Sequence, residues 1–183
     1  MDETTRARIT EYVRPLAVGL DGVTNYGDVE RVAAAADLIA RGRPDVDADR
    51  LFLLAVFSGQ EKWVSRMGHR SRTELFLASL GVARRDVSAL FRSLERLDTD
   101  PRTPEEEIVH DAVRLDRLGA YGIARSLVEG YRERQDFVEM AAAIEEEAGV
   151  GLRTPAAEAL AAPRRETMRD FAKKLRQEYG EFA

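Results

Sequence analysis

The 183-residue sequence contains no cysteine and only two histidines, three lysines and one tryptophan. Without cysteine there can be no disulfide bond, no thiolate nucleophile and no cysteine-ligated metal. Two histidines leave little imidazole, the side chain that binds many transition metals in proteins. No apolar run approaches the roughly 20 residues of a membrane-spanning helix, so we expect no membrane segment.

The charge balance is mildly acidic, with 28 Lys and Arg against 33 Asp and Glu, a formal net charge of −5. The basic residues are not clustered, so nucleic acid is not expected as a partner. The N-terminus is polar and acidic and carries no secretory signal, which favours a cytoplasmic location. The length suits one domain spanning residues 1–183, and the sequence leaves the oligomeric state open.

Apolar residues recur mostly at helical spacing, and no segment shows the alternation of a strand or a fixed-period repeat. We therefore predict an all-α bundle of about eight or nine helices. Pro15 should end or kink the first helix, which covers residues 4–18. Later helices should begin at side chains that can cap them, namely Asp28, Asp47, Ser71 (with Glu74), Thr103 (with Glu106) and Thr154.

Residues 51–57 are apolar on every side, which predicts the most buried helix of the bundle. The chain then passes through Ser58 and Gly59 into a polar segment, residues 60–70, predicted as a loop or irregular helix.

The stretch from Thr103 to Leu127 is the most informative part of the sequence. Pro104 suits the first helical position, and Ile108, Ala112, Leu115 and Gly119 form one inward stripe. Asp111 lies beside that stripe, where a carboxylate is costly unless it has a partner.

This stretch resembles the third motif region of small bacterial HD-domain phosphohydrolases, whose typical text is Asp-Ala-Asp-Arg-Leu-Asp-Ala-hydrophobic-Gly-Ala. Here residues 111–120 read Asp-Ala-Val-Arg-Leu-Asp-Arg-Leu-Gly-Ala. The resemblance covers roughly residues 5–180. It aligns the family's His-x-x-Arg-Val with residues 28–32 and its name-giving His-Asp with Ser58-Gly59. The family's C-terminal helix aligns with residues 154–171, where Pro163 is expected to interrupt it.

The resemblance implies a divalent metal held by two histidines and two aspartates. At those positions this chain has Asp28, Ser58, Gly59 and Asp111, so only the last ligand is kept. We therefore predict no resident metal and no cofactor. Asp28, Ser58 and Asp111 should converge on a remnant pocket with Lys62 at its rim, and this pocket should prefer a neutral or cationic small molecule to a phosphate.

Each of these residues also has a simpler interpretation. Ser58 fits a loop or capping serine, and Lys62 fits an exposed loop residue. Asp111 could pair with Arg114, one helical turn further on. The sole tryptophan, Trp63, either lines the pocket or only packs.

Two further features are weaker candidates. His110 and Asp111 form an HD dipeptide, but it lies within a helix, so an exposed His110 is the simplest interpretation. A metal site combining it with His69 is a remote alternative. Asp116 lies about 140° around the helix from Asp111 and is expected to be structural.

Three functions remain open. The favoured one is a divergent HD-fold protein that has lost its metal centre and binds a small molecule or partner. The others are a metal-independent enzyme, for example a biosynthetic one, that uses the remnant pocket, and an HD-type phosphohydrolase with a rearranged metal site.

Overall fold

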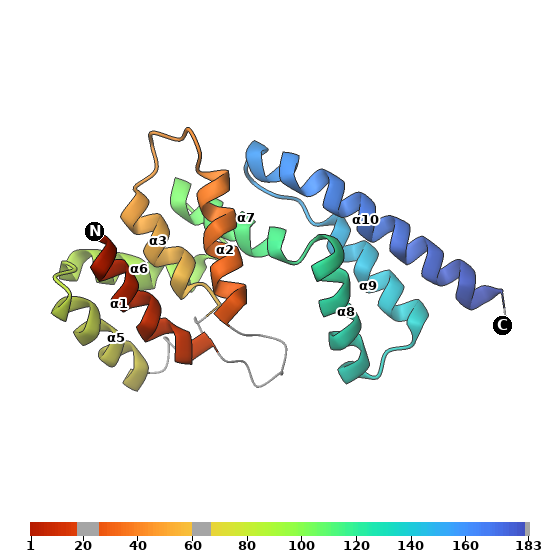
Figure 1. The fold of residues 1–183 in the computed structure, drawn as a ribbon, viewed down its shortest axis with the longest axis horizontal. Helices are drawn as coiled ribbons and strands as arrows, with labels where there is room; N and C mark the ends of the chain where they lie inside the picture. Colours follow the sequence, from red (N-terminus) through yellow and green to blue (C-terminus); the bar gives the residue numbers. More distant parts are fainter. Residues whose placement is uncertain (18–25, 60–66, 182–183) are drawn as a thin grey trace. The chain divides into compact units, whose positions relative to one another are not determined.

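A computed structural model describes residues 1–17, 26–59 and 67–181 of the chain. Within these ranges the regular structure consists of nine α-helices and a short 3₁₀-helix, with no strand (Figure 1). The predicted all-α class is therefore confirmed. The chain divides into two compact units, residues 1–112 and 113–183, and the division falls inside one helix. A single domain over the whole chain stays a prediction.

The first unit is centred on a buried helix. Its elements are α1 (Glu3–Val13), η1 (Arg14–Ala17), α2 (Tyr26–Ile39), α3 (Ala48–Phe57), α5 (Met67–Ser79), α6 (Arg84–Arg96) and most of α7 (Pro104–Asp116). α3 packs against both α2 and α6, and Leu54 and Ala55 are each only 1% exposed, as the all-round apolar pattern predicts. Residues 40–47 join α2 to α3 as a hairpin, so α2 begins at the end of the pair where α3 finishes (Figure 1).

The second unit packs three helices together: α8 (Gly119–Glu133), α9 (Phe137–Gly149) and α10 (Pro155–Gly180). α10 begins as predicted: the Thr154 hydroxyl accepts from the backbone N–H of Ala157, and Pro155 is the first residue of the helix. Its buried face against α9 and α8 is largely alanine, which lets helices approach closely. The interruption predicted at Pro163 is wrong, because α10 continues through that proline to Gly180.

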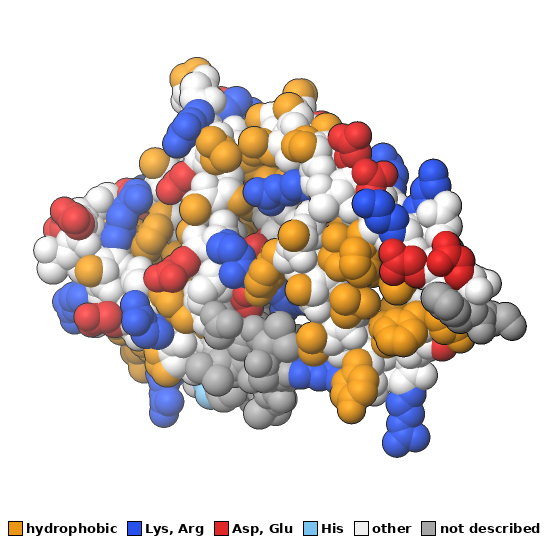
Figure 2. Space-filling model, turned by 45° about the vertical axis from the view of Figure 1, so that its right-hand side comes forward, with side chains coloured by type: hydrophobic (Ala, Val, Ile, Leu, Met, Phe, Trp, Pro, Cys, Tyr) orange, Lys and Arg blue, Asp and Glu red, His pale blue; other side chains and the backbone are white. Residues whose placement is uncertain are grey.

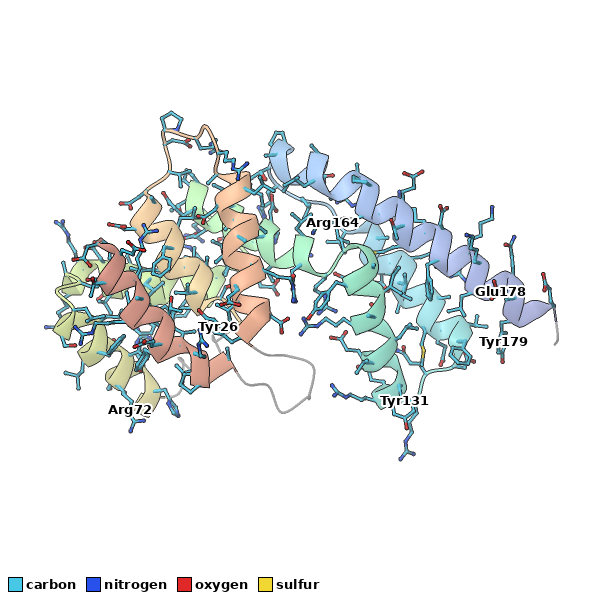
Figure 3. The ribbon with its side chains drawn as sticks, viewed as in Figure 1. Tyr26, Arg72, Tyr131, Arg164, Glu178 and Tyr179 are labelled. Carbon is cyan, nitrogen blue, oxygen red and sulfur yellow. The ribbon has the colours of Figure 1, made fainter. Side chains whose placement is uncertain are left out.

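The predicted inward stripe is confirmed, because Ile108, Ala112, Leu115 and Gly119 are all buried, but its last member belongs to the next helix. α7 ends at Asp116, and α8 begins at Gly119, whose φ of +79° favours glycine. Arg164, labelled on α10 in Figure 3, donates from Nη1 to the Leu115 carbonyl at 2.9 Å. That bond satisfies a carbonyl which the end of α7 leaves without an intrahelical partner.

Two predicted helix starts are displaced toward the N-terminus. α2 begins at Tyr26, so Asp28 lies in its first turn and not at its cap. α5 begins at Met67, so Ser71 lies inside the helix and His69 lies in its first turn, not in a loop. The predicted cap at Asp47 is confirmed, because its Oδ1 accepts from the backbone N–H groups of Asp49 and Arg50.

One face of the molecule shows the distribution of its side chains. On the face drawn in Figure 2, basic and acidic side chains lie interspersed with apolar ones. Among the helices that the structure describes, none has both the length and the apolar composition required to cross a bilayer.

Candidate functional site at the α2–α3 hairpin and α7

Asp28 is a buried carboxylate in the first turn of α2. Its Oδ1 accepts a hydrogen bond of 2.5 Å from Nη2 of Arg31, one turn further along the helix. A negative charge is favoured at a helix N-terminus, so both the helix dipole and Arg31 stabilise the ionised acid. The position where the resemblance implies a histidine thus holds an acid that already has a cationic partner.

Ser58 is the residue at which α3 ends. Its backbone is extended, and Gly59 follows with a φ of +79°. The buried hydroxyl donates to the carbonyl oxygen of Ala55 at 2.7 Å. The hydroxyl proton is therefore used within the helix end, and only the oxygen lone pairs remain as acceptors. Because α2 and α3 form a hairpin, Ser58 and Asp28 lie at the same end of it (Figure 1).

Asp111 is fully buried in α7, and the preceding residue is a partner. Nδ1 of His110 lies 3.1 Å from Oδ1 of Asp111. The interpretation of His110 as an exposed residue is wrong, since its side chain is only 6% exposed. The sequence predicted that Asp111 needs a partner, and a buried imidazole provides one; an ion pair with Arg114 stays a prediction.

Lys62 and Trp63 lie outside the described residues. Among residues 1–17, 26–59 and 67–181, no three His, Asp or Glu side chains gather into a group that could hold a metal ion. The combination of His69, His110 and Asp111 falls within these ranges and forms no such group. Convergence of Asp28, Ser58 and Asp111 stays a prediction, although all three side chains are buried.

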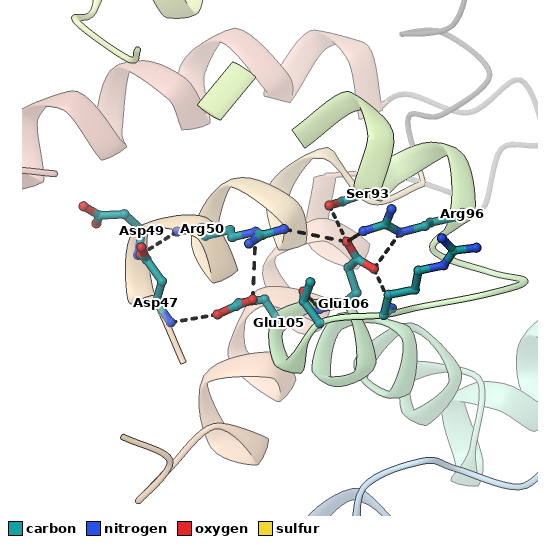
Figure 4. A network of polar contacts seen from close by, with 9 residues as sticks. Asp47, Asp49, Arg50, Ser93, Arg96, Glu105 and Glu106 are labelled. Carbon is teal, nitrogen blue, oxygen red and sulfur yellow. Dashed lines mark hydrogen bonds and ion pairs between the residues drawn. The ribbon is translucent and has the colours of Figure 1, made fainter. Parts of the chain in front are cut away.

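A buried acidic network at the start of α7 was missed by sequence reasoning, which assigned Glu106 only to a capping box. The Thr103 hydroxyl does accept from the Glu106 backbone, at 3.3 Å. The Glu106 carboxylate itself points elsewhere and accepts from Ser93 Oγ, from Nε and Nη2 of Arg96, and from the backbone N–H of Arg102 (Figure 4).

The neighbouring acid, Glu105, ties α7 to the start of α3. Its Oε1 accepts from the backbone N–H of Asp47 at 2.9 Å, and its Oε2 lies 3.9 Å from Nε of Arg50 (Figure 4). The only signal in the sequence was a run of three glutamates in a first helical turn, which a helix dipole explains equally well.

Two opposing effects act on the pKa of Glu106. Burial raises the pKa of this carboxyl, but hydrogen bonds from Arg96, Ser93 and the Arg102 backbone outweigh burial and hold it below its usual value. Glu106 is therefore ionised at neutral pH, and the network fastens α6 to α7.

No family model and no curated protein matches the sequence. Solved structures do match over nearly the whole chain. A Lactobacillus plantarum protein has a TM-score of 0.78 at 20% identity, covering 99% of both chains. Bacillus subtilis YpgQ, solved in complex with ADP, has a TM-score of 0.73 at 20% identity, covering 96% of this chain and 95% of its own.

A Bacillus thuringiensis protein described as an HD-superfamily hydrolase has a TM-score of 0.76 at 18% identity, covering 97% of this chain and 98% of its own. The chain therefore shares the all-helical fold of these proteins, one of which is described as an HD-superfamily hydrolase, so the fold implied by the resemblance is confirmed. Similarity at this level of identity defines the fold, and it does not carry over an activity.

Proposed function

We propose that this protein binds a small molecule or partner at the hairpin end of α2 and α3 without the metal chemistry of HD phosphohydrolases. The pocket is formed by Asp28, Ser58 and Asp111, with Lys62 at its rim. The observation that carries the proposal is that all three described groups make internal hydrogen bonds, to Arg31, to the Ala55 carbonyl and to His110.

This donor set does not fit a transition metal. Such an ion prefers imidazole nitrogens and carboxylates that are available to it. Here the Asp28 carboxylate faces the Arg31 guanidinium and the Asp111 carboxylate faces the His110 imidazole. The Ser58 hydroxyl is a weak, neutral metal ligand.

The charge of the pocket favours a neutral or cationic ligand. The positive charge of Arg31 balances the negative charge of Asp28. The second carboxylate, Asp111, therefore leaves the pocket without a surplus of positive charge to bind a phosphate. Phosphate recognition relies on a metal or on several guanidinium groups. YpgQ was solved with ADP, so a nucleotide and its neutral nucleoside make a matched pair of probes for this fold.

The experiment is calorimetric titration of the purified protein with adenosine, ADP and the diamine putrescine, with and without Mn²⁺, alongside elemental analysis. We expect adenosine or putrescine to bind at least as tightly as ADP, Mn²⁺ to leave ADP binding unchanged, and iron, manganese, zinc and nickel to stay well below one ion per chain. Asp111→Asn should weaken binding, and Asp116→Asn, at the end of the same helix, should not. Tight Mn²⁺-dependent ADP binding that is lost in Asp111→Asn would overturn the proposal.

One observation favours a second candidate, a metal-independent enzyme. A buried imidazole with a carboxylate at Nδ1 is the arrangement that orients a histidine as a general base. Turnover of an activated ester in the presence of a chelator, lost in His110→Gln and kept in His69→Gln, would support it. Equal rates in the two variants would exclude this role for His110.

A further inference from the structure

A cavity of about 590 Å³ lies within the first unit, between α1, α3 and α6. This volume falls within the range of about 300–1,000 Å³ typical of small-molecule pockets. One part of its wall is apolar and is formed by Leu53, Leu54, Leu80, Val82 and Leu90. The remaining wall carries charged side chains from the N-terminal turns of the three helices.

The aspartates of this wall already have partners. Asp2 caps α1 by accepting from the backbone of Thr5, and Asp47 caps α3. Asp49 accepts from Nη2 of Arg6 at 2.8 Å, and Asp86 lies 3.6 Å from Arg85. Hydrogen bonds from the N-terminal amine and from Arg6 lower the pKa of Asp49, so this acid stays ionised and paired with these two groups.

Arg50 differs from the aspartates. Its guanidinium stands 3.9 Å from Glu105 and 3.8 Å from Glu106, too far for direct hydrogen bonds (Figure 4). Glu106 cannot serve as a closer acceptor, because Ser93, Arg96 and Arg102 already donate to it. The two glutamates orient the guanidinium electrostatically, and its N–H donors remain available to a molecule in the cavity.

We propose that this cavity binds a small carboxylic acid with an aliphatic or aromatic body. The ligand carboxylate accepts two parallel hydrogen bonds from Arg50, the geometry for which a guanidinium is suited. The apolar body lies against Leu53, Leu80 and Val82. Ser93, which also lines the cavity, donates its hydroxyl to Glu106 and so fixes the position of that carboxylate behind Arg50.

This site is separate from the one proposed above. Arg50 lies in the first turn of α3, whereas Ser58 follows its last residue, and a helix of this length places them about 12 Å apart along the axis. Loss of one site leaves the residues of the other unchanged.

The test uses three probes with one body: 4-phenylbutyrate, 4-phenylbutanol and 4-phenylbutylamine, each titrated into the full chain by calorimetry. The acid should bind at least about tenfold more tightly than the alcohol, because a charge-assisted bond outweighs a neutral one. The amine should bind more weakly than either. Ala89→Phe, which fills part of the cavity and leaves the arginine unchanged, should abolish binding of all three.

Arg50→Gln should weaken binding of the acid by about tenfold or more and leave that of the alcohol unchanged. Arg50→Lys keeps the positive charge but lacks the planar guanidinium, so its affinity for the acid should lie between those of wild type and Arg50→Gln. The control is Arg84→Gln, which changes an exposed arginine at the start of α6 outside the cavity lining. Its affinity for the acid should stay within about twofold of that of wild type. Circular dichroism confirms that each variant is folded. The proposal would be overturned if the acid and the alcohol bound equally well, if the amine bound more tightly, or if the acid showed no saturable binding. It would also be overturned if Arg50→Gln bound the acid as tightly as wild type.

Discussion

Replacing Glu106 tests whether the buried network at the start of α7 stabilises the fold. The side chain is fully buried and accepts four hydrogen bonds, two of them from Arg96. Glu106→Ala leaves the Arg96 guanidinium and the Ser93 hydroxyl facing each other across an unfilled space. Removing one partner of a fully buried pair costs about 3–5 kcal/mol.

Arg96 keeps some contact with water, its side chain being 27% exposed, so the expected cost is somewhat smaller. We expect Glu106→Ala to lower the free energy of unfolding by about 2–4 kcal/mol. The midpoint of thermal unfolding should fall by on the order of 10 °C for a chain of this size. Urea denaturation at neutral pH measures the first quantity, and a thermal melt measures the second.

Glu107 provides the matched control, because it lies on the same helical turn and is less buried. Glu107→Ala should change stability by no more than about 0.5 kcal/mol. A cost for Glu106→Ala below about 1 kcal/mol, or equal to that of Glu107→Ala, would refute the argument, because an uncompensated buried charge cannot be that cheap.

The same residue makes stability depend on pH. The pKa of Glu106 is lower in the folded protein than its ordinary value of 4.5, so its contribution is present above that value and is lost as pH falls through the folded pKa. The stability difference between wild type and Glu106→Gln should be constant near pH 7 and should shrink below about pH 4.5. A difference that stays constant into acid would show that the ionised form is not what the network stabilises.

Two other pairs of variants test packing. Leu54→Ala, at a site 1% exposed, should lower the free energy of unfolding by about 2–5 kcal/mol, whereas Leu75→Ala, at a site 74% exposed on α5, should leave it almost unchanged. If urea titrations gave the reverse order, the placement of α3 in the core would be contradicted. Gly122→Ala should be strongly destabilising, because the added Cβ would lie 1.8 Å from the Arg117 carbonyl oxygen, whereas Gly149→Ala meets nothing within 4 Å and should be tolerated. Equal thermal midpoints for the two glycine variants would mean that α8 can shift away from Arg117 at little cost.

Residues that act through their own helix were predictable. The caps at Asp47 and Thr154 depend on a side chain and a backbone only a few positions apart. The core position of residues 51–57 follows from their apolar composition on every side. The partner needed by Asp111 was also foreseen, because a charge beside an apolar stripe needs one wherever the helix packs.

Residues that act through another helix were not predictable. Glu106 looked like half of a capping box, and its actual partners come from α6 and from the turn before α7. His110 looked exposed, because nothing in its own helix shows which elements cover it. Pro163 looked like a helix end, yet α10 continues through it while packing along α9 and α8.

The sequence by itself determined the all-helical class and the core position of residues 51–57, because helical periodicity and apolar composition are local properties. It also places Asp and Ser at positions 28 and 58, where the resemblance implies histidines. Only the tertiary structure decided which charges are paired, that His110 is buried against Asp111, and that Arg50 faces a cavity with its donors available. Burial and pairing depend on side chains that are distant in sequence and that only folding brings within hydrogen-bonding distance.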